Sequence, residues 1–383
     1  MKASISVVIP ALNEEGVVGK TVSAVPVEKL RALGLDVEVL VVDNASQDNT
    51  AEEAKRAGAR VVREDRRGYG NAYLRGFSEA SGDILVMLDA DGTYPAEDIP
   101  KFIQPLLTGR ADFVTGSRLK GSIEAGAMPW LHRHVGNPLL TGFLNILFHA
   151  GISDAHCGMR AFTKDALKKM NLRSSGMEFA SEMVIEAARK KLRIIEVPID
   201  YRVRGGGKPK LNSFQDGWRH LRFMLLYSPT KLFVVPGALL TILGLAIVFA
   251  LTAGPLKFGS IFFYIHPMIL GNLLVLAGLQ TLLLGLFNSV YSVTKGLSEP
   301  DALTKAVMKY SSLERELLLG FALFLLGFLA AGKILYVWVK SGFGELSELK
   351  NAIVASTLMF VGIQFIFSAI FLSVLLLDRR EER

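Results

Sequence analysis

Two aspartates separated by one residue, Asp89 and Asp91, have the types and spacing best suited to chemistry in this sequence. They follow the apolar run 84–88, and in extended geometry residues i and i+2 share a face. Two carboxylates placed in this way repel each other unless a cation neutralises them. Carboxylate oxygens suit Mg²⁺ or Mn²⁺, which commonly bridge to substrate phosphates. The pair therefore predicts a divalent-metal site, and the alternative is a solvated acidic turn.

The elements that position this pair are predicted to form a parallel sheet covered by helices on both faces. Short β-branched runs predict strands at 6–9, 37–42, 60–63, 84–88 and 112–115. Helical patterns lie between them, near 15–31, 50–57, 70–80 and 97–107. Such alternation is typical of a parallel α/β sheet, in which ligands bind at the carboxyl ends of the strands. Several polar residues follow these strands, and we expect them to share one crevice: Asn13, Glu15, Asp43, Asp89, Asp91 and Arg118.

The second half of the 383-residue sequence is dominated by long uncharged runs. A transmembrane helix needs about 20 mostly apolar residues. Four spans are predicted, at about 232–251, 267–290, 317–339 and 352–377. These runs exclude a wholly soluble protein and a disordered chain. The single cysteine, Cys157, excludes a disulfide scaffold.

The predicted organisation is a catalytic domain over 1–210, an interfacial amphipathic helix over 211–230 and a membrane domain over 231–383. In the middle segment apolar residues recur at helical spacing among basic ones, which is typical of a helix lying in the bilayer interface.

Lysine and arginine gather before the first span, between the second and third, and after the fourth. This bias predicts a cytoplasmic catalytic domain and C-terminus, in the plasma membrane or an endomembrane. The net charge of +7 beside membrane spans favours anionic lipids as partners over nucleic acid. Self-association through the transmembrane helices stays open.

Several motifs together resemble the family 2 glycosyltransferases of GT-A fold: Val8-Ile9-Pro10-Ala11-Leu12-Asn13-Glu14-Glu15, Val41-Val42-Asp43-Asn44-Ala45-Ser46 and Asp89-Ala90-Asp91-Gly92-Thr93-Tyr94-Pro95. Others are similar to the polyprenyl-phosphate branch, which includes dolichyl-phosphate mannose and glucose synthases: Gly116-Ser117-Arg118, Asp154-Ala155-His156-Cys157-Gly158-Met159-Arg160 and Glu196-Val197-Pro198-Ile199. The resemblance implies a Rossmann-like nucleotide-sugar domain. It also implies transfer of one sugar, with inversion, from a nucleotide sugar to polyprenyl or dolichyl phosphate.

The resemblance also implies a role for each matching residue. The donor would be bound by Pro10, Asn13, Glu15, Asp43, Asp89, Arg202, Arg204 and Lys210. The lipid phosphate would be bound by Arg118, Arg133 and Asn137. The cofactor, Mg²⁺ or Mn²⁺, would be held by Asp89, Asp91 and Thr93. The residues that act directly in catalysis would be Asp89, Asp91, Arg118 and Arg133.

A phosphate nucleophile agrees with the lack of an evident general-base set in the sequence. The second pKa of a phosphate monoester is near ~6, so a lipid phosphate is mostly ionised at neutral pH and needs no general base. No Ser-His-Asp or Cys-His set is evident in the sequence. UDP-glucose and UDP-N-acetylglucosamine are the favoured donors. The alternatives are GDP-mannose as the donor, a growing polysaccharide as the acceptor, and a non-catalytic carrier or nucleotide-sugar sensor.

Overall fold

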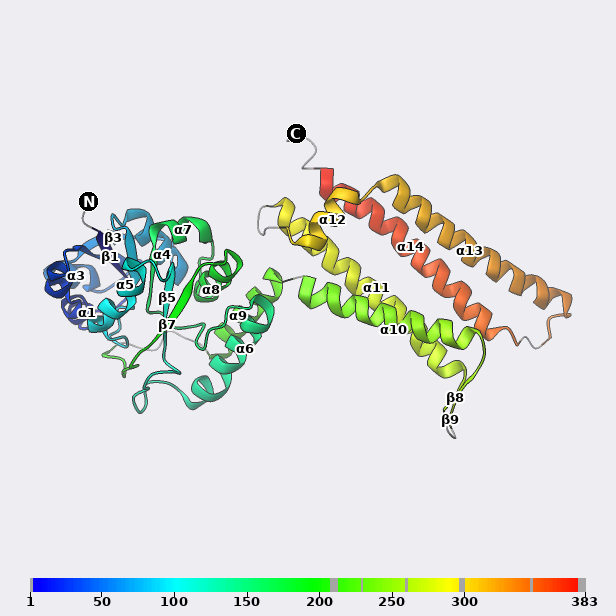
Figure 1. Ribbon diagram of the computed structural model, residues 1–383, viewed down its shortest axis with the longest axis horizontal. Helices are drawn as coiled ribbons and strands as arrows, with labels where there is room; N and C mark the ends of the chain where they lie inside the picture. Colours follow the sequence, from blue (N-terminus) through cyan, green and yellow to red (C-terminus); the bar gives the residue numbers. More distant parts are fainter. Residues whose placement is uncertain are drawn as a thin grey trace. The chain divides into compact units, whose positions relative to one another are not determined.

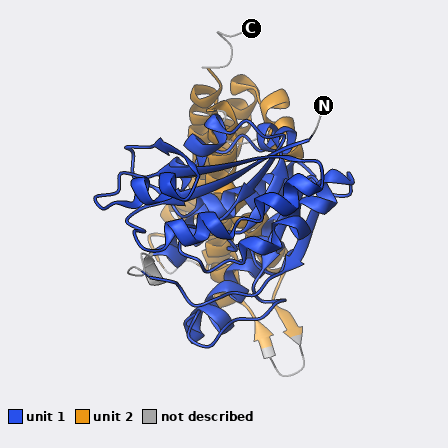
Figure 2. Ribbon diagram, turned by 90° about the vertical axis from the view of Figure 1, so that its left-hand side faces the viewer, with its two compact units in different colours: residues 1–224 blue, residues 225–383 orange. Residues whose placement is uncertain are grey.

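The computed structural model describes residues 3–206, 213–228, 230–258, 261–295, 300–344 and 347–377. The chain folds into two compact units, residues 1–224 and 225–383 (Figures 1 and 2). The boundary falls within helix α9 (Ser213–Tyr227).

A mixed sheet forms the centre of the first unit, with the strand order β3-β2-β1-β4-β6-β5-β7 in its described residues. The strands are β1 (Ser4–Ala11), β2 (Asp36–Asp43), β3 (Arg60–Arg63), β4 (Ile84–Met87), β5 (Phe113–Ser117), β6 (Arg160–Thr163) and β7 (Ile194–Pro198). The five strands predicted from the sequence are all present. These five strands run parallel to one another, and β6, which was not predicted from the sequence, runs antiparallel to both β4 and β5. This short strand begins with a charged residue and lacks an apolar run.

Helices cover both faces of the sheet, as predicted. One face packs against α1 (Val18–Ala24), α2 (Val27–Ala32), α3 (Thr50–Arg56) and α5 (Ile99–Leu107). The other packs against α4 (Tyr69–Glu79), α7 (Lys164–Met170) and α8 (Phe179–Arg189). Alternate residues of β1 enter the two cores, Val7 on one face and Val8 on the other, as strand geometry requires. The single helix expected near 15–31 is two helices, because Pro26 separates them.

The second unit is built from long apolar helices. Four of them are long and apolar enough to cross a membrane: Thr230–Thr252, Ile265–Thr294, Leu313–Lys340 and Leu349–Leu377. In Figure 1 they correspond to a π-helical turn (Thr230–Val234) continued by α10 (Val235–Thr252), then α11, α13 and α14. Each predicted span lies within one of these helices. A small hairpin, β8 (Leu256–Phe258) with β9 (Ile261–Phe263), and helix α12 (Ala302–Tyr310) lie between them.

Candidate active site

The acidic pair follows β4, and separate groups hold its two carboxylates in place. Asp89 Oδ1 accepts hydrogen bonds from the hydroxyls of Tyr69 (3.1 Å) and Tyr73 (3.3 Å), both on α4. Asp91 Oδ1 accepts from the backbone N–H (3.1 Å) and the hydroxyl (2.7 Å) of Thr93. The pair is therefore fixed from the helix layer on one side and from its own turn on the other.

Asp89 and Asp91 lie close enough together that a nearby positive charge would stabilise their ionised forms. Burial, and then the neighbouring Asp91 carboxylate, raise the pKa of Asp89 to about 7. The Arg118 guanidinium opposes this rise in the pKa of Asp89, as a nearby positive charge does. A cation that neutralises Asp91 would lower the pKa of Asp89 and keep both groups ionised at neutral pH.

A basic segment that follows β7 lies against the pair. The Arg204 Nη1 is 3.2 Å from Asp91 Oδ2, and its Nη2 forms a second ion pair with the buried Glu14. The backbone N–H of Arg202 donates to the carbonyl of Thr93 (3.0 Å). The side chain of Arg202 forms an ion pair with Glu97. The guanidinium of Arg204 thus supplies positive charge to Asp91 in this structure.

Arg118 follows β5 and is held by a buried carboxylate. Its Nε and Nη2 donate to the two oxygens of Asp154, at 2.7 and 2.8 Å, and its backbone N–H adds a third bond at 3.1 Å. The guanidinium carbon lies 5.3 Å from the centre of the Tyr201 ring. Asp154 is fully buried. Two nitrogens of Arg118 are therefore committed to the protein, which fixes the direction of the third, Nη1.

The predicted donor residues near β1 and β2 form a second group of contacts. Asn13 has a positive φ of 50°, and its side-chain oxygen accepts from the N–H of Gln47 at 2.8 Å. The Glu15 carboxylate accepts from the side-chain amide of Asn49 at 2.9 Å. Asp43 ends β2 opposite Ala11, one residue beyond Pro10.

Glu14 links this group to the acidic pair. Its backbone N–H donates to the hydroxyl of Thr50 at 2.8 Å, and its carboxylate forms an ion pair with Arg204. The structure therefore brings together Asn13, Glu15, Asp43, Asp89, Asp91, Thr93, Arg118, Arg202 and Arg204, which lie in or beside connected loops.

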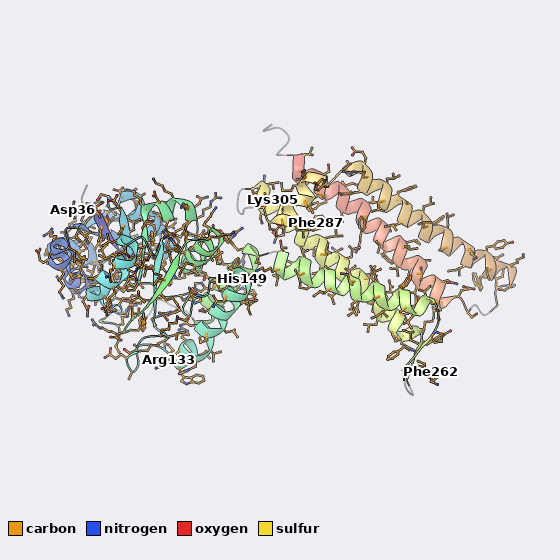
Figure 3. All side chains as sticks on the ribbon, viewed as in Figure 1. Asp36, Arg133, His149, Phe262, Phe287 and Lys305 are labelled. Atoms are coloured by element: carbon orange, nitrogen blue, oxygen red, sulfur yellow. The ribbon has the colours of Figure 1, made fainter. Side chains whose placement is uncertain are left out.

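Arg133 and Asn137 stand apart from these loops. Arg133 is exposed in a π-helical turn (His132–Gly136) before α6 (Asn137–Phe148), and Figure 3 shows it at the periphery of the first unit. The Asn137 amide contacts the sulfur of Met128 at 3.6 Å. Within the described residues, no side-chain hydrogen bond or ion pair joins either residue to the acidic pair. Lys210 lies outside the described residues.

Sequence reasoning missed several residues that support the site. Glu14 is one of them, because its burial and its ion pair with Arg204 are set by the fold and have no local signal in the sequence. Asp154 stands in a motif that was recognised, but its partner Arg118 is 36 positions away and only the fold joins them. Tyr69 and Tyr73, one helical turn apart, share a face that could have been matched to a carboxylate.

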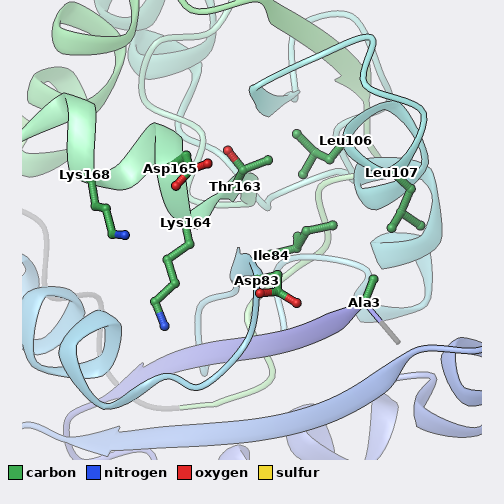
Figure 4. Close-up of a pocket in the computed structure, with 9 residues that line it drawn as sticks. All are labelled: Ala3, Asp83, Ile84, Leu106, Leu107, Thr163, Lys164, Asp165 and Lys168. Atoms are coloured by element: carbon green, nitrogen blue, oxygen red, sulfur yellow. The ribbon is translucent and has the colours of Figure 1, made fainter. Parts of the chain in front are cut away.

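Two other features are excluded as the centre of this site. Burial raises the pKa of the Cys157 thiol to about 12, so it carries no thiolate at neutral pH. A pocket of about 460 Å³ is lined by residues including Ala3, Asp83 and Ile84 (Figure 4). Because Ala3 and Asp83 precede β1 and β4, this pocket lies at the amino ends of the strands, opposite the acidic pair.

An α/β sheet with an acidic pair and arginines at the carboxyl ends of its strands, followed by apolar helices, defines the class of a membrane-bound enzyme for phosphate-bearing substrates. Residues 6–170 match the model of glycosyl transferase family 2, and residues 286–376 match the family 2 C-terminal transmembrane region. The low-salt glycan biosynthesis hexosyltransferase Agl6 of Haloferax volcanii is 44% identical over 376 residues, covering 97% of this chain and 89% of that relative. The chain belongs to glycosyltransferase family 2, with a GT-A-like domain, and is an integral membrane protein.

Two further proteins are similar over the catalytic unit. A UDP-N-acetylglucosamine–dolichyl-phosphate N-acetylglucosaminyltransferase of Methanococcus voltae is 34% identical over 218 residues, covering 51% of this chain and 84% of that relative. Glucosyl-3-phosphoglycerate synthase of Mycobacterium tuberculosis, solved with Mn²⁺, UDP and glucosyl-3-phosphoglycerate, has a TM-score of 0.48 and 24% identity. It covers 58% of this chain and 79% of that chain.

Proposed function

We propose that this membrane glycosyltransferase transfers one sugar from a nucleotide sugar to a polyprenyl phosphate, with UDP-glucose or UDP-N-acetylglucosamine as the favoured donor. The observation that carries the proposal is the meeting of Asp89, Asp91, Arg118 and Arg204 at one edge of the sheet, in a chain with four apolar helices. The name of the Methanococcus voltae relative, a UDP-N-acetylglucosamine–dolichyl-phosphate transferase, supports a UDP-sugar donor and a lipid-phosphate acceptor.

The residues present fit a divalent cation. Asp89 and Asp91 offer hard oxygen ligands, and Arg204 already places positive charge on Asp91. No cluster of three His, Cys, Asp or Glu side chains that could hold a metal occurs among the described residues. Two carboxylates completed by substrate phosphates are the usual arrangement for Mg²⁺. We therefore assign Asp89 and Asp91, with Thr93 beside them, to Mg²⁺ or Mn²⁺, which would stabilise the departing nucleotide diphosphate.

In this proposal, arginines bind the phosphate groups of both substrates. Arg118, fixed by Asp154, directs Nη1 at the acceptor phosphate, which attacks the anomeric carbon from the face opposite the leaving group and inverts it. Arg202 and Arg204 exchange their carboxylate partners for the donor diphosphate, because phosphate accepts the same bidentate hydrogen bonds. Pro10, Asn13, Glu15 and Asp43 would line the nucleoside pocket. Lys210 stays a proposed donor contact.

Arg133 and Asn137 stay proposed contacts for the lipid phosphate. Support comes from helix α6, which begins at Asn137: one turn on, the hydroxyl of Thr141 accepts from the N–H of Ala155 at 3.2 Å. Ala155 is the neighbour of Asp154, which holds Arg118. The segment that carries the two residues is thus attached to the loop that orients Arg118.

The distribution of lysine and arginine favours a cytoplasmic catalytic unit, so the acceptor would be drawn from the cytoplasmic leaflet of the plasma membrane or an endomembrane. Glycosylation-site mapping of the loop between α10 and α11 tests this orientation. Modification of an engineered acceptor site there is expected, and modification of the catalytic unit would contradict it.

A donor screen tests the function. Purified protein in detergent receives a polyprenyl phosphate, Mn²⁺ or Mg²⁺, and one of UDP-glucose, UDP-N-acetylglucosamine or GDP-mannose, with release of nucleotide diphosphate as the readout. Release that requires the lipid and one UDP-sugar is expected. Release with GDP-mannose alone would overturn the donor assignment. Release that requires a glycan acceptor, or none with any donor, would overturn the proposed reaction.

A further inference from the structure

The second unit contains a sequence repeat that joins its two long central helices, α11 (Ile265–Thr294) and α14 (Leu349–Leu377). Residues 278–290 read Gly-Leu-Gln-Thr-Leu-Leu-Leu-Gly-Leu-Phe-Asn-Ser-Val, and residues 362–374 read Gly-Ile-Gln-Phe-Ile-Phe-Ser-Ala-Ile-Phe-Leu-Ser-Val. The glycine, glutamine, phenylalanine, serine and valine recur in register. Leucine exchanges for isoleucine between them, and glycine for alanine.

The helices that precede them repeat as well. In α10, Gly237 and Gly244 are separated by one heptad, with Leu240 and Leu243 between them. In α13 (Leu313–Lys340), Gly320 and Gly327 have the same spacing, with Leu323 and Leu326 between them. Each half of the unit is therefore a helical hairpin with small residues at heptad intervals.

The two hairpins pack through equivalent atoms. A Cβ on Gly237 would meet the N of Leu282 at 2.5 Å and the O of Gly278 at 2.7 Å. A Cβ on Gly320 would meet the N of Ile366 and the O of Gly362, both at 2.9 Å. These partners occupy the same places in the repeat.

The next heptad gives the same result. A Cβ on Gly244 would meet the O of Gly271 and the N of Val275, at 2.5 and 2.6 Å. A Cβ on Gly327 would meet the O of Ala355 and the N of Met359, at 2.7 and 2.8 Å. The hairpins α10–α11 and α13–α14 are thus alike in their backbone contacts as well as in sequence.

Where the hairpins meet, equivalent residues touch each other. Gln364 Nε2 donates to Gln280 Oε1 at 3.2 Å, across 84 positions of sequence. The rings of Phe287 and Phe371 have the same separation in sequence, and their centres lie 4.8 Å apart. Figure 3 labels Phe287 on α11. A constant separation means that α11 and α14 run parallel and in register, and contact between like residues is the signature of a two-fold interface.

We propose that the membrane unit is a tandem repeat of one helical hairpin, whose two copies pair about an approximate two-fold axis at the α11–α14 contact. The partner that this surface of α11 fits is a second copy of its own hairpin, supplied here by the same chain. The glutamine pair sets the register, because an amide on an apolar membrane-spanning helix needs the opposite amide as its hydrogen-bond partner.

Exchange of the repeat tests the proposal in the full-length protein. Residues 363–370 are replaced by the sequence of 279–286, which keeps the glutamine and supplies the equivalent apolar residues. The matched control carries the same residues in an order that moves the glutamine away from position 364. The exchanged protein is expected to elute as one species in detergent, with a thermal midpoint near the native value. The control is expected to elute as several species and to have a lower thermal midpoint. Equal failure of the two proteins would overturn the equivalence.

Cross-linking tests the axis independently of that chimera. The Phe287→Cys/Phe371→Cys protein is expected to form an intrachain cross-link with a short thiol reagent, in an otherwise native chain. Leu284 and Val374, which are both exposed on the surface of the unit, give the control pair Leu284→Cys/Val374→Cys. The native Cys157 is buried and stays unmodified. Cross-linking of the control pair alone would overturn the in-register contact.

Discussion

Conversion of Asp154 to asparagine tests whether Asp154 orients Arg118, because the variant keeps the arginine but weakens the bonds that hold it in place. The change keeps the size of the side chain and removes the charge that binds Arg118 through two side-chain nitrogens. Asp154 is completely buried and the Arg118 side chain is 9% exposed. Loss of one partner of such a buried pair leaves an uncompensated charge, which costs about 3–5 kcal/mol of folding free energy.

The catalytic effect follows from the same bonds. A hydrogen bond to a charged group contributes about 1.5–3 kcal/mol. If Arg118 loses one such bond to the acceptor phosphate in the transition state, kcat/KM for polyprenyl phosphate falls roughly 10- to 150-fold. The assay varies the lipid at saturating nucleotide sugar, below the unfolding temperature of the variant, with nucleotide diphosphate release as the readout.

The chain offers a matched control at the other end of β5. Asp112 precedes this strand and binds Arg193 through the same two types of nitrogen, at 2.9 and 2.7 Å. That arginine is 58% exposed, so after solvent screening Asp112→Asn should cost only ~1 kcal/mol of stability and leave kcat/KM unchanged. Equal kinetic loss in the two variants, or none in Asp154→Asn, would refute the orienting role of Asp154.

Three further predictions concern other parts of the molecule. Arg204→Gln removes a guanidinium proposed to bind the donor diphosphate, so KM for the nucleotide sugar should rise about 10-fold or more, and an unchanged donor KM would contradict this role. Burial lowers the pKa of His220 from 6.5 to about 4. Its neutral form therefore contributes stability that is complete above pH 6.5 and lost as the pH falls through 4. Between pH 6.5 and 4, the thermal midpoint of the native protein should fall with pH more steeply than that of His220→Asn. An equal dependence on pH in the two proteins would contradict the lowered pKa of His220. Gly362→Ala places a Cβ 2.5 Å from the N of Phe324 and should cost about 1–3 kcal/mol. Gly332→Ala, with nothing within 4 Å, should cost nothing in the same detergent melt, and equal midpoints would count against tight helix packing.

The predicted strands and spans were located from local signals. β-Branched runs located five strands, and the length of the uncharged runs located four helices, because burial in a sheet or a bilayer selects residue type directly. Strand β6 has only four residues, and its first residue, Arg160, bonds the carbonyls of Ala155, Cys157 and Ala180. Its place between β4 and β5 is given by its antiparallel pairing with both strands, and such long-range pairing leaves no periodic pattern in the sequence.

The site residues that directly follow predicted strands could be predicted from the sequence, whereas the ion pairs that hold the site arginines could not. Asp89 and Asp91 were found because they follow an apolar run at a spacing of two. The pairing of Arg204 with Glu14 joins positions 190 residues apart, and nothing local to either residue announces it. The same holds for Arg118 and Asp154, which only the order of the strands brings together.

Incorporation of labelled sugar into lipid by the Asp91→Asn protein tests the central claim most directly. The native protein, Asp91→Asn and the control Asp98→Asn, whose partner is the exposed Lys101, receive labelled nucleotide sugar, Mn²⁺ and polyprenyl phosphate. Label extracted into organic solvent is then counted. The account predicts lipid-dependent label with the native protein and Asp98→Asn, and a loss of roughly 100- to 1000-fold with Asp91→Asn. Native-level labelling by Asp91→Asn would contradict it.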